Sequence, residues 1–419
     1  MRNELQSRFR VRPYWWMVLT ALAIRLAVIP FVYQDWMDPF VLSHWAFGLI
    51  ARSIVSGHGF GSPFAETGTS ALLPPVYCYL LAGIFKVFGI ETRASVLAAL
   101  SLNSLFSAMT CIPVFLLSRK AFGDRVAKWA GWGWALSPYG IYYGADWAWS
   151  TPLVTFELAW LFFFAWWLEE SSKKRDWVLF GVLGGFAALT EPVVLSVVPL
   201  LGLWTLFRRY RENLSWRSQL LAAACGALAV MSPWLIRNYE LFHRFIPVRD
   251  GFGLELYIGN NGYSQRWVNS NLHPNHSDQE LAEYERVGEI AYMNHKLLQA
   301  KAYIRSHPGW FVWMTCRRVV YMWTGYWSFD RAYLKDEPLD PPNIFVQTTM
   351  SVFGLLGLRR LFKHGSPLAM RFVIVLVFFP LAYYISHPET YYFRPVDPLI
   401  VVLAAVCVAG RSRAQEKLA

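Results

Sequence analysis

Acidic, histidine and arginine side chains that can catalyse or bind gather in a few short polar segments of an otherwise apolar chain. The first segment carries Asp35 and Asp38 close to His44. A carboxylate beside a histidine can accept a proton, so we take Asp35 and Asp38 as candidate catalytic residues and His44 as a candidate substrate-binding residue. Asp38 also precedes Pro39, and this pair is typical of a helix start, so a structural role explains Asp38 as well.

The second polar segment comes just before the last apolar run and holds His387, Tyr391, Tyr392 and Arg394. A guanidinium can bind a phosphate through two parallel hydrogen bonds. We therefore expect Arg394 to bind a phosphate and the other three residues to contact the substrate. The alternative is an arginine that only extends to the membrane surface or pairs with Asp397.

Further binding candidates are Glu191, Arg237, Asn260 and Asn261. A charge at the end of an apolar run, such as Glu191, is a functional candidate, although it can simply reach water. Arg237 is another cation next to a long polar segment. Asparagine amides suit the hydroxyls of a sugar, but a turn explains the asparagine pair equally well.

The composition excludes several classes of protein. Of the 419 residues, 55% are hydrophobic and 16% are charged, against about 25% charged residues in soluble proteins. The five cysteines form no CxxC pair, so neither a zinc site nor a disulfide framework is predicted. His273, His276 and the acids of the same polar segments could bind a divalent metal, but their spacing matches no ligand set, so a metal is not indicated and no cofactor is assigned.

Lysine and arginine cluster in every second gap between apolar runs, and the other gaps hold acids, histidines and tyrosines. Cytoplasmic loops retain Lys and Arg, so the pattern predicts a multi-pass protein of the plasma (inner) membrane with both termini in the cytoplasm. It also explains the net charge of +11 without nucleic-acid binding. The clusters are Arg2/Arg8/Arg10/Arg12, Arg119/Lys120/Arg125/Lys128, Lys173/Lys174/Arg175, Arg208/Arg209/Arg211/Arg217, Arg359/Arg360/Lys363 and Arg411/Arg413/Lys417.

The predicted fold class is an all-α polytopic membrane protein with about ten transmembrane helices, outer interfacial helices and a small extracytoplasmic loop domain. An N-terminal transmembrane module covers residues 1–236, with a first outer loop at 34–95. An extracytoplasmic loop region with an interfacial helix covers 237–342, and a C-terminal transmembrane module covers 343–419.

Two apolar stretches are not counted as spans. Counting Leu72–Phe88 would invert the topology of everything after it, and its proline pair suits a helix start near the membrane surface. Trp310–Trp327 has two arginines at its centre, which favours an interfacial helix. Within the loop region, Ser277–Tyr303 is predicted to form an amphipathic helical pair. Of the remaining charges, Arg25 is expected to form a structural pair, and Asp146 fits a belt of aromatic residues.

The chain resembles bacterial GT-C class glycosyltransferases, the broad family that includes protein O-mannosyltransferases and the lipid A aminoarabinose transferase. The order of several short motifs along one membrane protein carries the resemblance. The motifs are Ile50-Ala-Arg-Ser53, Ser56-Gly-His-Gly-Phe60, Thr67-Gly-Thr69, Pro74-Pro-Val-Tyr77, Phe85-Lys-Val-Phe-Gly89, Leu189-Thr-Glu-Pro192, Pro233-Trp-Leu-Ile-Arg-Asn238, Gly253–Asn261 and Tyr392-Phe-Arg-Pro395.

The resemblance implies transfer of a sugar from a polyprenyl-phosphate-linked donor, by an inverting single displacement outside the cytoplasm. The family's acidic residue in the first outer loop corresponds to Asp35 or Asp38. Partners would be the lipid-linked donor, membrane lipids and an acceptor that is a glycan, a lipid or a protein. A transporter or lipid flippase is the alternative, but such proteins tend to contain inverted repeats, and none is evident here.

Overall fold

The computed structural model describes residues 13–64, 68–146, 148–263, 272–328, 330–336 and 340–410. Within these ranges the chain is helical, and extended pairing is limited to an isolated bridge between Gly61 and Thr69. The predicted all-α fold class is therefore confirmed. The first and last cation clusters, at 2–12 and 411–417, lie outside the described residues.

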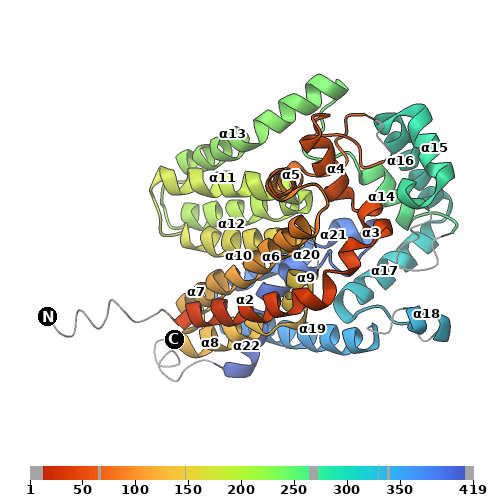
Figure 1. Ribbon diagram of the computed structural model, residues 1–419. Coiled ribbons are helices and arrows are strands. Elements are labelled where there is room, and N and C mark those ends of the chain that lie inside the picture. Colours follow the sequence, from red (N-terminus) through yellow and green to blue (C-terminus); the bar gives the residue numbers. More distant parts are fainter. Residues whose placement is uncertain are drawn as a thin grey trace.

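A bundle of helices forms most of the molecule (Figure 1). Its helices are α2 (Pro13–Val32), α6 (Arg93–Met109), α7 (Cys111–Phe122), α8 (Asp124–Ala135), α9 (Pro138–Ala145), α10 (Thr151–Trp167), α11 (Lys174–Thr190), α12 (Val198–Arg211), α13 (Arg217–Phe242), α19 (Asp340–Lys363), α20 (Ala369–Phe378), α21 (Leu381–Ile385) and α22 (Asp397–Ala409). The first residues of α2 and the last residues of α22 lie at the same end of the bundle (Figure 1).

By length and composition, 4 helical segments of the described chain can cross a membrane: Tyr14–Val32, Arg93–Phe122, Pro192–Arg211 and Arg217–Phe242. The predicted count of spans is higher because some predicted spans are shorter than 18 residues in the structure, for example Thr151–Trp167 and Ala369–Ile385. One predicted span divides into α8 and α9, and another into α20 and α21. The second helix of each pair begins at a proline, Pro138, or directly after one, Pro380, and proline lacks the N–H needed to continue a helix.

Shorter helices cover the opposite end of the bundle, toward the right of Figure 1. They are η1 (Asp35–Met37), α3 (Pro39–His44), α4 (Ala46–Val55), α5 (Pro75–Phe88), α14 (Phe252–Gly259), η4 (Pro274–His276), α15 (Asp278–Val287), α16 (Glu289–Ser306), α17 (Pro308–Thr324) and α18 (Arg331–Asp336), while η2 (Pro192–Ser196) and η5 (Arg394–Val396) join bundle helices. The predicted start of α5 at the proline pair and the predicted α15–α16 pair are both confirmed.

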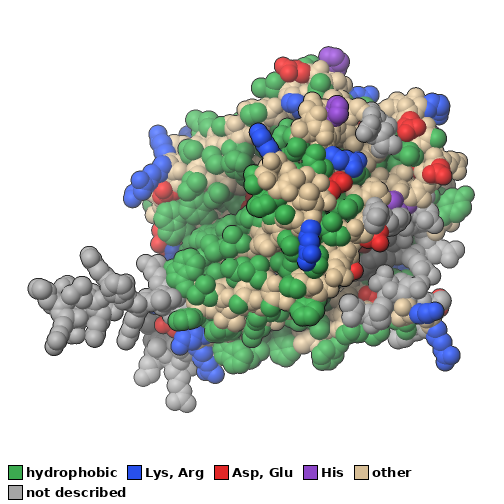
Figure 2. Space-filling model, in the orientation of Figure 1, with side chains coloured by type: hydrophobic (Ala, Val, Ile, Leu, Met, Phe, Trp, Pro, Cys, Tyr) green, Lys and Arg blue, Asp and Glu red, His purple; other side chains and the backbone are tan. Residues whose placement is uncertain are grey.

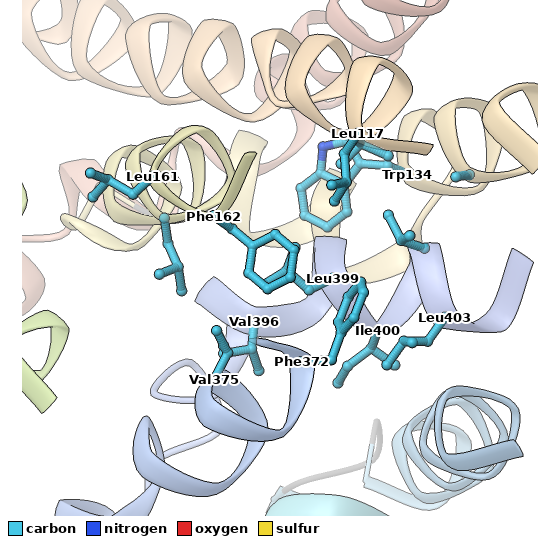
Figure 3. Close-up of a cluster of buried hydrophobic side chains, with 14 of the residues drawn as sticks. Leu117, Trp134, Leu161, Phe162, Phe372, Val375, Val396, Leu399, Ile400 and Leu403 are labelled. Carbon is cyan, nitrogen blue, oxygen red and sulfur yellow. The ribbon is translucent and has the colours of Figure 1, made fainter. Parts of the chain in front are cut away.

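The main hydrophobic core lies where α7, α8, α10, α20 and α22 meet (Figure 3). Phe162 and Phe372 pack there with ring centroids 4.7 Å apart. Outside this core, hydrophobic side chains also cover much of the bundle surface (Figure 2). Phe31 is 84% exposed and Leu221 is 65% exposed. Soluble monomers rarely expose apolar surface on this scale, so the surface has the character of a membrane protein.

The buried Arg25 of α2 has a structural role, as predicted, but its partners are mainly backbone carbonyls rather than a carboxylate. Its Nε donates to Ser107 Oγ and to the carbonyl of Gly140, both at 2.9 Å. Its Nη1 donates to the carbonyls of Ala21 and Ala135, both at 3.0 Å. Arg25 thus links α2 to α6, α8 and α9, and it satisfies carbonyls that the break between α8 and α9 leaves free.

Candidate active site

Asp35 lies near Asp146 at the C-terminal end of α9. Asp35 is the first residue of η1 and is exposed, and the neighbouring Trp36 donates from its indole N–H to the backbone carbonyl of Asp146 at 3.2 Å. Asp146 is the residue that ends α9. Burial raises the pKa of Asp146 to about 6, and the negative charge of Asp35 acts in the same direction. The two acids therefore form a carboxylate pair.

Asp38 and His44 lie in the same segment as Asp35; Asp38 directly precedes α3, and His44 is its last residue. Asp38 precedes Pro39, the first residue of α3, so the predicted helix start is confirmed. The Asp38 side chain is exposed. The His44 ring stacks on His276, with centroids 5.0 Å apart and planes 16° from parallel. This stack joins the first outer loop to the loop region that carries α15 and α16.

A second group of charges surrounds Arg249, between the bundle and α14. Arg249 forms an ion pair with Glu255. His387 donates from Nδ1 to the backbone carbonyl of Glu255 at 3.1 Å, and its Nε2 lies 3.4 Å from Glu255 Oε2. Burial raises the pKa of Glu191 to about 7, although the positive charge of Arg249 nearby opposes this shift. The structure thus brings together Glu191 and His387, which are far apart in the sequence.

Aromatic rings connect this charged cluster to the loop after Asp146. Tyr392 stacks on Tyr383 with centroids 4.5 Å apart, and Tyr391 packs edge-on against Tyr392 at 4.7 Å. Tyr391 also lies 6.0 Å from Trp149, which follows Asp146 in the chain. Tyr391 and Tyr392 therefore link the loop after Asp146 to the residues near Arg249.

Arg394 is buried between two cavities. Its Nη1 donates to Gln347 Oε1 at 2.9 Å and lies 3.1 Å from Asp397 Oδ2, so the alternative of a pair with Asp397 is realised. The smaller of two small cavities is lined by both Arg394 and Asp397. The larger one, which like the first has room for about one water molecule, is lined by Arg394, Gln347 and polar residues of the last loop, including Glu389. A buried guanidinium whose Nε has no partner among the described residues can bind an anion.

Helix α9 connects the carboxylate pair to Arg394. Tyr139 near its start lies beneath the Arg394 guanidinium, with 3.9 Å between Cζ and the ring centroid. One turn further on, the Tyr143 hydroxyl donates to Thr390 Oγ1 at 2.8 Å. Asp146 ends the same helix, about 10 Å from Tyr139 along the axis at the usual rise per residue. Asp35 thus lies near Asp146 at the C-terminal end of α9, and Arg394 lies over Tyr139 near the start of this helix.

The guanidinium of Arg237 donates hydrogen bonds to backbone carbonyls of the protein. Its Nη1 donates to the carbonyl of Ser70 at 2.8 Å and its Nη2 to the carbonyl of Phe60 at 3.2 Å. The buried Glu289 holds the same loop from the other side, accepting from Ser70 Oγ at 2.6 Å and from the Ala71 N–H at 2.7 Å. Arg237 and Glu289 therefore fasten the first outer loop between α13 and α16.

Asn260 and Asn261 lie buried at the C-terminal end of α14. Asn260 Nδ2 donates to the carbonyl of Ile385 at 2.8 Å, and its Oδ1 accepts from Arg318 Nη1 at 3.3 Å. Asn261 Nδ2 donates to the carbonyl of Tyr257 at 2.7 Å. These bonds fix the end of α14 against α17 and α21, so sugar contacts by the two amides remain a prediction.

Sequence reasoning missed three residues that the structure places at these sites: Arg249, Glu255 and Gln347. Arg249 lies in an irregular loop, Glu255 lies in the short helix α14, and Gln347 lies inside the long helix α19, so no periodic pattern marks any of them. Asp146 was interpreted as part of a belt of aromatic residues. Its position, an acid at the end of an apolar run, is the signal that could have marked it as a candidate site residue. Among the described residues, no group of three or more His, Cys, Asp and Glu side chains has the arrangement of a metal site.

Part of the chain is similar to a known protein family. Residues 73–236 match the dolichyl-phosphate-mannose-protein mannosyltransferase family. This match includes α9 and Asp146, and it confirms the predicted resemblance for that part of the chain. No protein among those with curated functions matches the chain.

Solved structures with a similar fold include the oligosaccharyltransferase of Archaeoglobus fulgidus. Its apo form has a TM-score of 0.55 at 16% identity, over 94% of this chain and 50% of that chain. The form tethered with an acceptor peptide containing the NVT sequon has a TM-score of 0.54 at 15% identity, over 96% of this chain and 50% of that chain. This chain thus spans about half the length of that enzyme, and at this identity the likeness concerns the fold.

Proposed function

We propose that this protein is a glycosyltransferase that moves a sugar from a polyprenyl-phosphate-linked donor to an acceptor outside the cytoplasm. The observation that carries the proposal is the arrangement along α9, with the Asp35–Asp146 pair at one end and Arg394 over Tyr139 near the other. The family matched over 73–236 is described by a lipid-phosphate sugar, dolichyl-phosphate-mannose. An acid and a cation at this separation suit the two ends of such a donor.

In the proposed reaction Asp35 is the general base. Its carboxylate takes the proton of an acceptor hydroxyl, and the hydroxyl oxygen forms a bond to the anomeric carbon of the sugar. The bond from that carbon to the phosphate oxygen breaks, and its electron pair leaves with the lipid phosphate. Arg394 stabilises the negative charge that develops on the leaving group. One displacement inverts the configuration at the anomeric carbon.

The sugar would lie between these two groups. Tyr391 and Tyr392 offer ring faces there, and His387 and Glu191 offer hydrogen-bonding groups from the cluster around Arg249. His44 would contact the acceptor side, because it lies on the same outer loop as Asp35. Asp38 is the second candidate for the base.

We further propose that the protein lies in the plasma (inner) membrane with this site facing outside. The positive clusters of the sequence support that orientation, and the described ends of α2 and α22 lie away from the candidate site (Figure 1). The acceptor belongs to one of three classes: a glycan, a lipid or a protein.

Mass spectrometry of cell-envelope glycans from cells with and without the protein tests the proposed function. We expect one sugar modification to disappear with the protein. It should return when the unaltered protein is supplied, but not when Asp35→Asn is supplied at equal abundance. Identical glycan profiles in all strains would contradict a transferase role and would favour transport of a lipid.

A further inference from the structure

Arg394 and Asp397 form a buried ion pair whose hydrogen bonds are incomplete. The two residues stand three positions apart where η5 meets α22, and both are less than a tenth exposed. Within the described part of the chain, Arg394 Nε and both Asp397 carboxylate oxygens lack a hydrogen-bond partner. By contrast, the buried Asp176 accepts a hydrogen bond of 2.6 Å from Ser171 Oγ. Asp397 is therefore held by charge attraction to Arg394 alone.

Arg394 separates the two cavities and lines both of them, whereas Asp397 does not lie between them. Asp397 lines the smaller cavity only, whereas Arg394 lines both. The larger cavity has room for about one water molecule, so a phosphate oxygen reaches the guanidinium from that side only as the lining side chains move apart, while Asp397 remains in place. Any anion that binds Arg394 then lies close to the Asp397 carboxylate in a poorly solvated space, where like charges repel strongly.

We propose that Asp397 is a positioning residue that competes with the phosphate of the lipid-linked substrate for Arg394 and so limits how tightly the phosphate is held. This inference rests on the proposed function. Transfer converts a phosphodiester with one negative charge into a lipid monophosphate with nearly two. The repulsion from Asp397 grows with that conversion, so the product is held less tightly than it would be by Arg394 alone. Asp397 thus favours product release, a step that often limits turnover.

Other charged or titratable groups also face this pair. Tyr139 and Tyr143 come from α9, and Glu389 lines the larger cavity. Arg25 stands behind the wall of the smaller cavity, where it donates to Ser107 and Gly140. Burial raises the pKa of Asp397 to about 7, although the Arg394 charge opposes this shift. Protonation of Asp397 therefore frees Arg394 as the pH falls through neutrality.

Binding of polyprenyl phosphate to the purified protein tests the inference. Asp397→Asn removes the competing charge and keeps the shape of the side chain, so its affinity should rise by about five- to tenfold. The matched control, Asp176→Asn, also neutralises a buried carboxylate and should leave the affinity unchanged. The double variant Arg394→Ala with Asp397→Asn should bind as weakly as Arg394→Ala alone.

The pH dependence of binding distinguishes this role from a purely structural one, because a structural role of Asp397 would not change the affinity with pH. The probe is a polyprenyl methyl phosphodiester, whose single charge is constant between about pH 5.5 and pH 8.5. The unaltered protein should bind this probe more tightly as the pH falls through about 7, and Asp397→Asn should show no such change. This measurement on the unaltered protein keeps the inference testable if the variant does not fold.

Three results would overturn the inference. Unchanged or weaker phosphate binding by a folded Asp397→Asn variant would make Asp397 a structural support for Arg394. An affinity of the unaltered protein for the phosphodiester probe that does not change with pH would also show that Asp397 only supports Arg394. If the unaltered protein binds no polyprenyl phosphate at all, the proposed function fails and the inference fails with it.

Discussion

The guanidinium of Arg394 lies over the ring of Tyr139, with 3.9 Å between Cζ and the ring centroid. An aromatic face stabilises a cation without occupying its N–H groups. Arg394 Nε remains without a hydrogen-bond partner among the described residues. This relationship makes the phosphate-binding role of Arg394 open to a direct test.

Arg394→Lys should weaken donor binding even though the positive charge is kept. An ammonium cannot form two parallel hydrogen bonds to a phosphate, as a planar guanidinium can. We expect the affinity for the donor to fall about tenfold or more, equivalent to the ~1.5–3 kcal/mol of a hydrogen bond to a charged group. Titration of the purified protein with the polyprenyl-phosphate sugar measures this change.

Arg317→Lys is the matched control, because Arg317 also lies over a tyrosine, Tyr321, at 5.4 Å. Its donor affinity should not change. Donor binding that is unaffected in both Arg394→Lys and Arg394→Ala would mean that the phosphate is held elsewhere. Lys86 and Arg93, which are cations of the first outer loop, would then be the next to examine.

The sequence predicts elements that depend on local physics. Proline at a helix start gives α5 its first residue, Pro75, and gives α3 its start after Asp38. The amphipathic pattern gives α15 and α16. The breaks in α8–α9 and α20–α21 were not predicted, because their flanking apolar residues continue the pattern of a span across each break.

The candidate site was predicted only in part, because its geometry depends on contacts between distant segments. Arg394 was found from its own type and position. Its contact with Gln347 joins two helices, and the Glu191–Arg249 approach joins two loops. Nothing local to those residues signals either contact. Asp146 was visible as an isolated acid, but its pairing with Asp35 requires the folded chain.

Glu191→Gln should change the pH dependence of stability. Burial raises the pKa of Glu191 to about 7 in the folded protein, above the value of about 4.3 for an unperturbed glutamate. The folded state therefore favours the protonated form, and stability is lost as the pH rises between these two values. Glutamine is neutral throughout, so the variant should unfold at a higher temperature than the unaltered protein at about pH 8 and at a similar one near pH 4.

Thermal unfolding of the two proteins across this pH range measures the effect. Glu212→Gln serves as the control, since Glu212 is exposed at the end of α12. A lower unfolding temperature for Glu191→Gln at high pH would show that Arg249 needs the Glu191 charge. That result would reverse the predicted sign.

Glu289→Ala should loosen the first outer loop. The change removes the acceptor for Ser70 Oγ, for the Ala71 N–H and for the Tyr284 hydroxyl, which donates at 2.8 Å. Leaving buried donors unpaired should lower the free energy of unfolding by about 2–4 kcal/mol. Hydrogen exchange should become faster in the peptide that contains Ser70 and Ala71. Glu285→Ala, an exposed neighbour on α15, should change neither quantity.

Gly181→Ala should separate α11 from α13. A Cβ atom at Gly181 would lie 1.9 Å from the carbonyl oxygen of Ala223, so the two backbones are too close for any side chain. We expect a loss of about 1–3 kcal/mol, the usual range for overpacking, seen as a lower unfolding temperature in detergent. Gly83→Ala in α5 is the control, because its Cβ would have no neighbour within 4 Å. Equal behaviour of the two variants would show that α11 and α13 do not pack this closely.

The most direct test of the central claim is a transfer assay with purified protein, polyprenyl-phosphate sugar donors and envelope-derived acceptors. The assay follows the release of polyprenyl phosphate together with the sugar-bearing acceptor by mass spectrometry. The unaltered protein should form both products in equal amounts. Asp35→Asn should fold normally but form neither, because an amide cannot accept the acceptor proton. Full activity in both Asp35→Asn and Asp38→Asn would contradict the account.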